Sequence, residues 1–170
     1  MSDRLPVPAY VENLPIERLR TAEHFLLYAA RLWVARFIDP TGVWPDLRQG
    51  FAAADMENDG WPAFDALFAA LAAGARRTLD IRCLKCRGLT GDEGRLLQAV
   101  SLAQNGRLDD AAAIMSDWLP PAAARIGMVP LTRLAQAMTA AGLTIPEREF
   151  AFGRVPRVTV AAHPGLALVQ

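Results

Sequence analysis

The chain has 170 residues, with 18 basic and 18 acidic side chains, and 52% of its residues are apolar. This composition excludes an intrinsically disordered chain, and the balanced charge argues against a surface built throughout for nucleic acid or anionic lipid. The length fits one domain that buries its own core. All but one of the basic residues are arginines and alanine is abundant, so the composition favours helices.

Residues 1–14 are predicted to form an extended N-terminal arm, because Pro6 and Pro8 disfavour helical geometry. These prolines also interrupt the apolar stretch that a secretory signal peptide needs, so we expect a cytoplasmic protein. The first helix is predicted over residues 15–38. Its apolar residues cover most of the circumference and leave one polar stripe, which includes His24 and Arg31. Such a helix is usually buried by several neighbours, so we expect it at the centre of a bundle.

A local repeat follows the first helix. Trp44-Pro45 and Trp61-Pro62 each precede apolar residues at the same offsets, and each proline is predicted to start a helix. After this pair of helices, residues 79–88 are predicted to be an irregular connection.

Three further helices are predicted from their start signals. Thr90 and Glu93 fit a capping box, in which each side chain satisfies a free backbone amide at the start of a helix. Asp109 or Asp110 is predicted to cap the next helix, and a last helix is predicted to follow Pro130.

The chain changes character beyond residue 142. Residues 157–161 and 166–169 are predicted to be strands joined by a turn at 163–165. No charged side chain occurs from residue 158 to residue 170, so this segment is expected to pack on its own domain or on another subunit.

The predicted fold class is therefore mainly α. We expect a single-domain bundle of five or six helices over residues 15–142, with a short C-terminal extended or β-hairpin element in a tail of residues 143–170.

Cys83 and Cys86 form the most distinctive local motif, a CxxC pair. Cations beside a thiol favour the thiolate, which attacks disulfides and binds soft metals, so a redox site and a zinc site are both predicted alternatives. A zinc site needs four ligands, and the two histidines of the chain, His24 and His163, are candidates to complete it. Two such motifs in a dimer would also supply four thiolates. The third alternative is that both cysteines are small structural residues at a helix junction.

A basic stretch surrounds this pair. Residues 76–87 contain one acidic residue and five basic ones, which are Arg76, Arg77, Arg82, Lys85 and Arg87. Arginine suits bidentate phosphate contacts, so this stretch is the candidate anion or nucleic-acid site. A solvated loop with a few ion pairs is the alternative interpretation.

No nucleophile elbow, phosphate-binding glycine loop or metalloprotease motif occurs in the sequence, so no catalytic residue is predicted. The leading hypothesis is a cytoplasmic, bacterial, non-enzymatic module that binds another protein or itself. No cofactor is predicted under this hypothesis, and zinc belongs to the alternative at Cys83 and Cys86. We expect no membrane partner, because the most apolar segments are too short to cross a bilayer, and the charge balance argues against nucleic acid.

Overall fold

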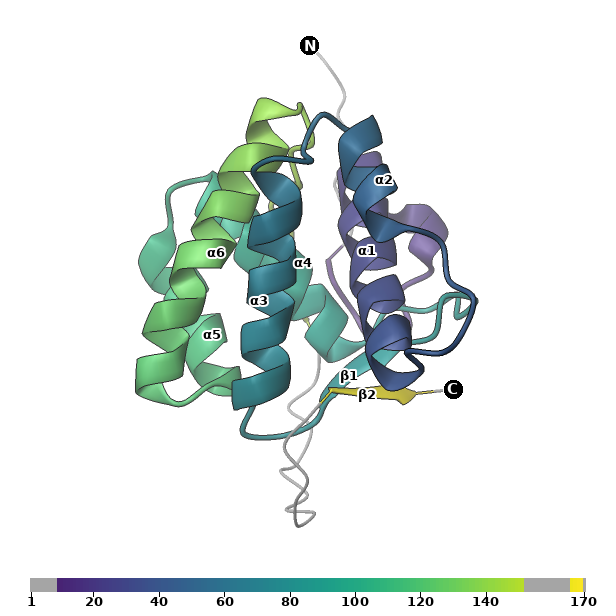
Figure 1. Cartoon of the computed structure of the whole chain (residues 1–170). Helices are drawn as coiled ribbons and strands as arrows, with labels where there is room; N and C mark the ends of the chain where they lie inside the picture. The colour runs from purple at the N-terminus through teal and green to yellow at the C-terminus, as the bar shows by residue number, and fades with distance from the viewer. Residues whose placement is uncertain (1–8, 152–165, 170) are drawn as a thin grey trace.

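The computed structural model describes residues 9–151 and the backbone of residues 166–169. In chain order the elements are η1 (Ile16–Arg18), α1 (Thr21–Ile38), α2 (Leu47–Ala53), α3 (Gly60–Gly74), β1 (Leu79–Arg82), α4 (Gly91–Gln104), α5 (Leu108–Trp118), α6 (Pro121–Ala140) and β2 (Leu166–Val169). The helices gather into one bundle, and the two strands lie at one end of it (Figure 1). This arrangement confirms the predicted mainly α fold class.

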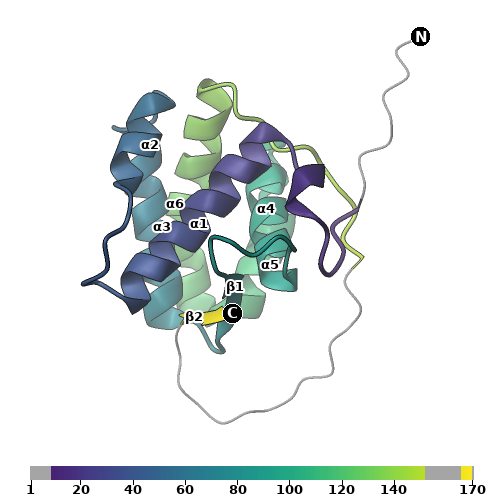
Figure 2. The same cartoon turned by 90° about the vertical axis from the view of Figure 1, so that its right-hand side faces the viewer.

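Two long helices organise the packing. Helix α6 packs against α3, α4 and α5, whereas α1 packs against α2, α4 and both strands (Figure 2). Most of α1 is buried, although Tyr28, Phe37 and Ile38 are about half exposed. Both helices therefore contribute a long face to the core.

An aromatic cluster fixes α1 against α2 and α3. The ring centroids of Phe51 and Phe64 are 5.1 Å apart, and those of Phe64 and Phe68 are 4.6 Å apart. Trp61 packs edge-on against Phe51, and Trp33 of α1 packs against Phe68. Large rings in such contact stabilise a core beyond their burial alone, so this cluster holds α1 in place.

The first helix starts later than predicted. Pro15 precedes the single turn η1, and α1 begins only at Thr21, because Leu19 and Arg20 have extended backbones. The carboxylate of Glu23 accepts a hydrogen bond from the Arg20 amide at 2.7 Å. A side chain that satisfies a free amide is a stronger start signal than the proline six residues earlier.

The prediction that each Trp-Pro pair starts a helix at its proline was wrong. Helix α2 begins at Leu47, because the Asp46 carboxylate accepts a hydrogen bond from the Arg48 amide at 3.0 Å. Helix α3 begins at Gly60, two residues before Pro62. Proline has no amide to donate, so it is tolerated anywhere in a first turn and does not mark the first residue.

The cap predicted for α5 was also wrong. The helix begins at Leu108, so Asp109 and Asp110 lie inside its first turn and not at the cap. Their charges are favourable there because the amino end of a helix carries partial positive charge.

The prediction that the last helix follows Pro130 was wrong, because α6 begins at Pro121 and runs through Pro130. A proline inside a helix leaves the carbonyl four residues earlier without its donor. That carbonyl belongs to Ile126, which is 69% exposed, so water can take the place of the missing amide. The turn of helix before Pro130 is thus retained.

The two strands form a small parallel sheet. Within the segment predicted to be irregular, Leu79–Arg82 form β1, which pairs with β2 in a register that places Leu79 opposite Leu166 and Arg82 opposite Val169. The strand predicted at residues 166–169 is confirmed. The other predicted strand, at 157–161, and the turn at 163–165 lie outside the described residues.

Candidate functional site

The start of α4 organises the region around the cysteine pair. The hydroxyl oxygen of Thr90 accepts a hydrogen bond from the Glu93 amide at 3.1 Å, and the Glu93 carboxylate accepts one from the Thr90 amide at 3.0 Å. This reciprocal pair confirms the predicted capping box. Glu93 is completely buried, so its charge needs a partner.

The partner of Glu93 is Arg31, from the middle of α1. Arg31 is 2% exposed and donates from Nε and Nη2 to the two carboxylate oxygens of Glu93, at 2.7 and 2.9 Å. This bidentate geometry is the strong form of an arginine–carboxylate contact. The polar stripe predicted on the first helix therefore includes an arginine that faces the interior.

The same ion pair holds both sides of the cysteine loop, which is residues 83–86. Arg31 Nη1 donates to the carbonyl of Cys86 at 2.5 Å, and Nη2 also donates to the carbonyl of Gly88 at 2.9 Å. On the other side, the Arg82 amide donates to Glu93 Oε1 at 3.0 Å. The backbone before Cys83 and the backbone at Cys86 are thus fixed to one buried pair of charges.

The sulfur atoms of Cys83 and Cys86 lie close enough to form a disulfide. Their Cα atoms are 5.4 Å apart, within the range that a disulfide spans, and the Cys86 amide donates to the Cys83 carbonyl at 3.1 Å. Both residues are half-buried, and the intervening Lys85 is exposed. The loop therefore turns back on itself near the surface.

The described residues contain no group of three or more His, Cys, Asp or Glu side chains that could hold a metal ion. His24 is half-buried in the first turn of α1, and His163 lies outside the described residues. The four residues predicted for a zinc site are accordingly not brought together within the described chain, apart from the two cysteines.

Three of the five residues predicted for anion binding form ion pairs. Arg77 donates from two nitrogens to Asp92, at 2.7 and 2.5 Å. Arg82 pairs with Glu12 at 3.3 Å, and Arg87 pairs with Glu17. The other two, Arg76 and Lys85, are exposed and have no ion pair within the described part of the chain. Most of the positive charge of this stretch is thus neutralised by neighbouring carboxylates.

Along one edge of β1, the backbone groups form hydrogen bonds with side chains instead of with another strand. The Asp80 amide donates to Asp92 Oδ2 at 2.8 Å, and the Asp80 carbonyl accepts from the Thr90 hydroxyl at 2.6 Å. The Arg82 amide is bonded to Glu93, as described above. Residues 80 and 82 of β1 therefore face the start of α4, so the alternate residues face β2 across the opposite edge.

The side chain of Asp80 is less well satisfied. Its Oδ1 atom is buried and has no hydrogen-bond partner among the described residues. Burial, followed by the nearby carboxylates of Asp92 and Glu93, raises the pKa of Asp80 above its ordinary value.

A second buried ion pair ties the ends of the described chain to α1. Arg148 donates from Nε and Nη2 to the carboxylate of Glu23 at 2.6 and 2.7 Å, and the Tyr10 hydroxyl donates to Glu23 at 2.6 Å. Burial, and then the Glu23 charge, raise the pKa of Tyr10. No local pattern in the sequence predicts this cluster, because Glu23 and Arg148 are 125 positions apart.

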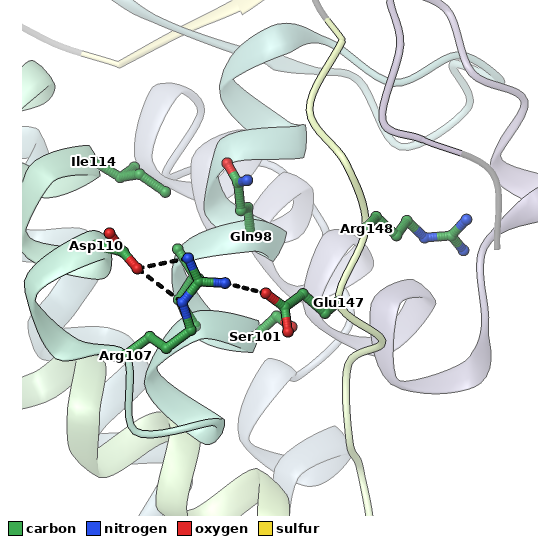
Figure 3. A pocket seen from close by; sticks show the side chains of 8 residues that line it. Gln98, Ser101, Arg107, Asp110, Ile114, Glu147 and Arg148 are labelled. Atoms are coloured by element: carbon green, nitrogen blue, oxygen red, sulfur yellow. Dashed lines mark hydrogen bonds and ion pairs between the residues drawn. The ribbon is translucent and has the colours of Figure 1, made fainter.

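A pocket of about 220 Å³ lies between α4, α5 and the segment after α6, and the sequence gives no sign of it. Figure 3 shows Arg107 at this pocket between Asp110 and Glu147, to both of which it is bonded. The remaining lining residues are Gln98, Ser101, Leu102, Ile114 and Arg148. Because Arg107 already has two carboxylate partners, the pocket offers no cation without a partner at that position.

No protein-family model, curated protein or solved structure matches the chain. None of the helices in the described residues is long and apolar enough to cross a membrane.

Proposed function

We propose that the protein is a cytoplasmic, non-enzymatic module that associates with a second copy of itself by exchanging strand β2. A bacterial source, which the arginine-rich composition suggests, belongs to the same proposal. The observation that carries the proposal is the unequal bonding of β1. Side chains at the start of α4 bond the backbone amides and carbonyl along one edge of β1. The backbone groups along the other edge need a neighbouring strand as their hydrogen-bond partner.

The chain carries its own strand for this edge. Residues 166–169 pair with β1 and belong to a tail without charged side chains, while residues 152–165 connect that tail to the bundle. A second copy would offer the same strand to the same edge. Exchange of an identical element keeps the contacts of the monomer and is a low-cost route to a dimer.

Apolar surface beside the strands supports the proposal. The C-terminal end of α1 lies near β2 in both views (Figures 1 and 2). Phe37 and Ile38, at this end, are 53% and 48% exposed. A second copy that packs against this end of α1 would cover them and add apolar burial to the strand pairing.

Sedimentation velocity of the full chain over a range of concentrations tests the proposal. We expect a reversible dimer, which a proline in β2 weakens. Alternate amides of a strand face its partner, so at least one of the variants Ala167→Pro and Leu168→Pro removes a donor to β1. Leu168→Val keeps the backbone amide of the strand, so it is the matched control and should sediment like the unchanged chain. A wild-type monomer at every concentration, or dimers in both β2 variants, would contradict the proposal.

A further inference from the structure

We propose that Cys83 and Cys86 form a reversible dithiol–disulfide site, and that the buried Arg31–Glu93 ion pair positions the two cysteines for this reaction. The inference is independent of self-association through β2. It rests on the contacts of the loop and on the exposure of the cysteines.

The loop of residues 83–86 is anchored by contacts that do not involve its sulfur atoms. Glu93 accepts from the amide of Arg82, directly before Cys83, and Arg31 donates to the carbonyl of Cys86. Both charged residues are at most 2% exposed, and their side chains are bonded to each other twice. The separation of the two cysteine backbones is therefore fixed by the ion pair, whether the sulfurs are joined or free.

More backbone bonds hold the stretch after the loop. The Ile16 amide donates to the Arg87 carbonyl at 2.9 Å, and the Leu89 amide donates to the Leu14 carbonyl at 3.0 Å. These bonds attach the loop to the N-terminal segment beside α1. Reduction of the disulfide consequently leaves the surrounding backbone in place, which is what a reversible site requires.

Both cysteines are half-buried instead of enclosed in the core, so a thiol reagent can approach them. The co-reactant is a low-molecular-weight disulfide. One cysteine thiolate attacks it, which releases one thiol and forms a mixed disulfide, and the second cysteine then displaces the other thiol. The protein dithiol loses two electrons and two protons, and the small disulfide becomes two thiols.

Preorganisation makes the second displacement favourable. Two thiols that are held near each other close a ring at little entropic cost, whereas thiols on a loose loop lose more freedom. In the cytoplasmic location proposed above, disulfides are usually transient and serve catalysis or redox sensing, which fits a pair that opens and closes.

The decisive experiment is a redox titration of the full chain in glutathione buffers at one pH. Alkylation of free thiols and mass spectrometry give the fraction oxidised. We expect a single two-electron transition to an intramolecular disulfide. In Glu93→Gln the equilibrium constant for oxidation should fall about tenfold, equivalent to a reduction potential about 30 mV less negative.

A matched control separates positioning from general destabilisation. Glu23→Gln damages the other buried ion pair, with Arg148, whose described hydrogen bonds run to Glu23 and to the Arg18 carbonyl. It should leave the oxidation constant unchanged. Arg31→Lys serves as the second loop variant, since lysine keeps the positive charge but cannot form the bidentate pair of hydrogen bonds with Glu93. Its oxidation constant should also fall.

Amide hydrogen exchange of the unchanged protein tests the same idea without a variant. The Arg82 amide should be equally protected in the oxidised and reduced forms, because Glu93 holds it in both. The proposal is overturned if no oxidation occurs in any glutathione buffer, if Glu23→Gln shifts the constant as much as Glu93→Gln, or if reduction removes the protection of Arg82.

Discussion

Replacing Glu93 by glutamine is expected to destabilise the fold by about 3–5 kcal/mol, the usual cost of leaving one charge of a buried ion pair without its partner. Each carboxylate oxygen of Glu93 accepts two hydrogen bonds. Oε1 accepts from Arg31 and the Arg82 amide, and Oε2 accepts from Arg31 and the Thr90 amide. A glutamine NH₂ group would face two donors in either orientation, and Arg31 would stay charged.

Urea denaturation followed by tryptophan fluorescence measures this loss. Stabilities of single domains are about 5–15 kcal/mol, so the expected loss is a large share of the total and shifts the midpoint strongly. A loss below about 1 kcal/mol, the range of exposed pairs, would refute the assignment of Arg31 and Glu93 as a buried pair.

The double replacement Arg31→Met with Glu93→Leu provides an internal check. It removes both charges, so it should be less destabilising than the sum of the two single replacements. It should still cost stability, because the carbonyls of Cys86 and Gly88 lose their donor. Strict additivity would show that the two charges do not interact.

Three smaller perturbations test other parts of the same structure. Thr90→Ala should cost about 1–2 kcal/mol in urea denaturation, because it removes the helix cap and the bond to the Asp80 carbonyl. Tyr10→Phe should cost about 1.5–3 kcal/mol in the same assay, because it removes a buried hydrogen bond to the charged Glu23 carboxylate. Asp80→Asn should stabilise the protein near neutral pH. The folded-state pKa of Asp80 is raised, so its favourable contribution exists in acid and is lost as pH rises through that pKa. The advantage of asparagine should therefore shrink as the pH falls towards 3.8, and an advantage independent of pH would contradict this account.

Features that depend on neighbouring residues were the ones predictable from the sequence. The capping box of Thr90 and Glu93 spans three positions, and its two bonds are present in the structure. The mainly α class followed from composition and periodicity. A proline is usually a sign that a helix starts or ends nearby, and this sign was misleading at Pro130. The exposed turn before it tolerates the proline within α6.

The strand β1 could not be predicted for a different reason. Its four residues form a strand because side chains of α4 bond one edge and β2 bonds the other. Neither partner is adjacent in sequence, since the bonded side chains at the start of α4 lie 10 to 12 positions away and β2 begins more than eighty positions later. A segment whose backbone groups are satisfied only by distant residues resembles a loop when its sequence is considered alone.

The candidate site was predictable in part. The sequence identifies the cysteine pair and its cations, because these residues are consecutive. It could not identify Arg31 as their anchor, since Arg31 and Glu93 are 62 positions apart. The sequence did contain one indication of this role. Arg31 lies on a helix that is apolar nearly all round, and a charged side chain on such a helix needs a buried partner.

The two buried ion pairs explain how a helical bundle orders its non-helical segments. Glu23 and Arg31 both lie on α1. The first binds Arg148 and Tyr10, which belong to the segments on either side of the bundle, and the second holds β1 and the cysteine loop through Glu93. A helix has no unpaired amides in its middle, so its polar and charged side chains are the groups with which it can fix an extended backbone. Because β1 and the cysteine loop depend on the same Glu93, a change there should alter strand docking and thiol oxidation together, whereas a change at Glu23 should alter neither.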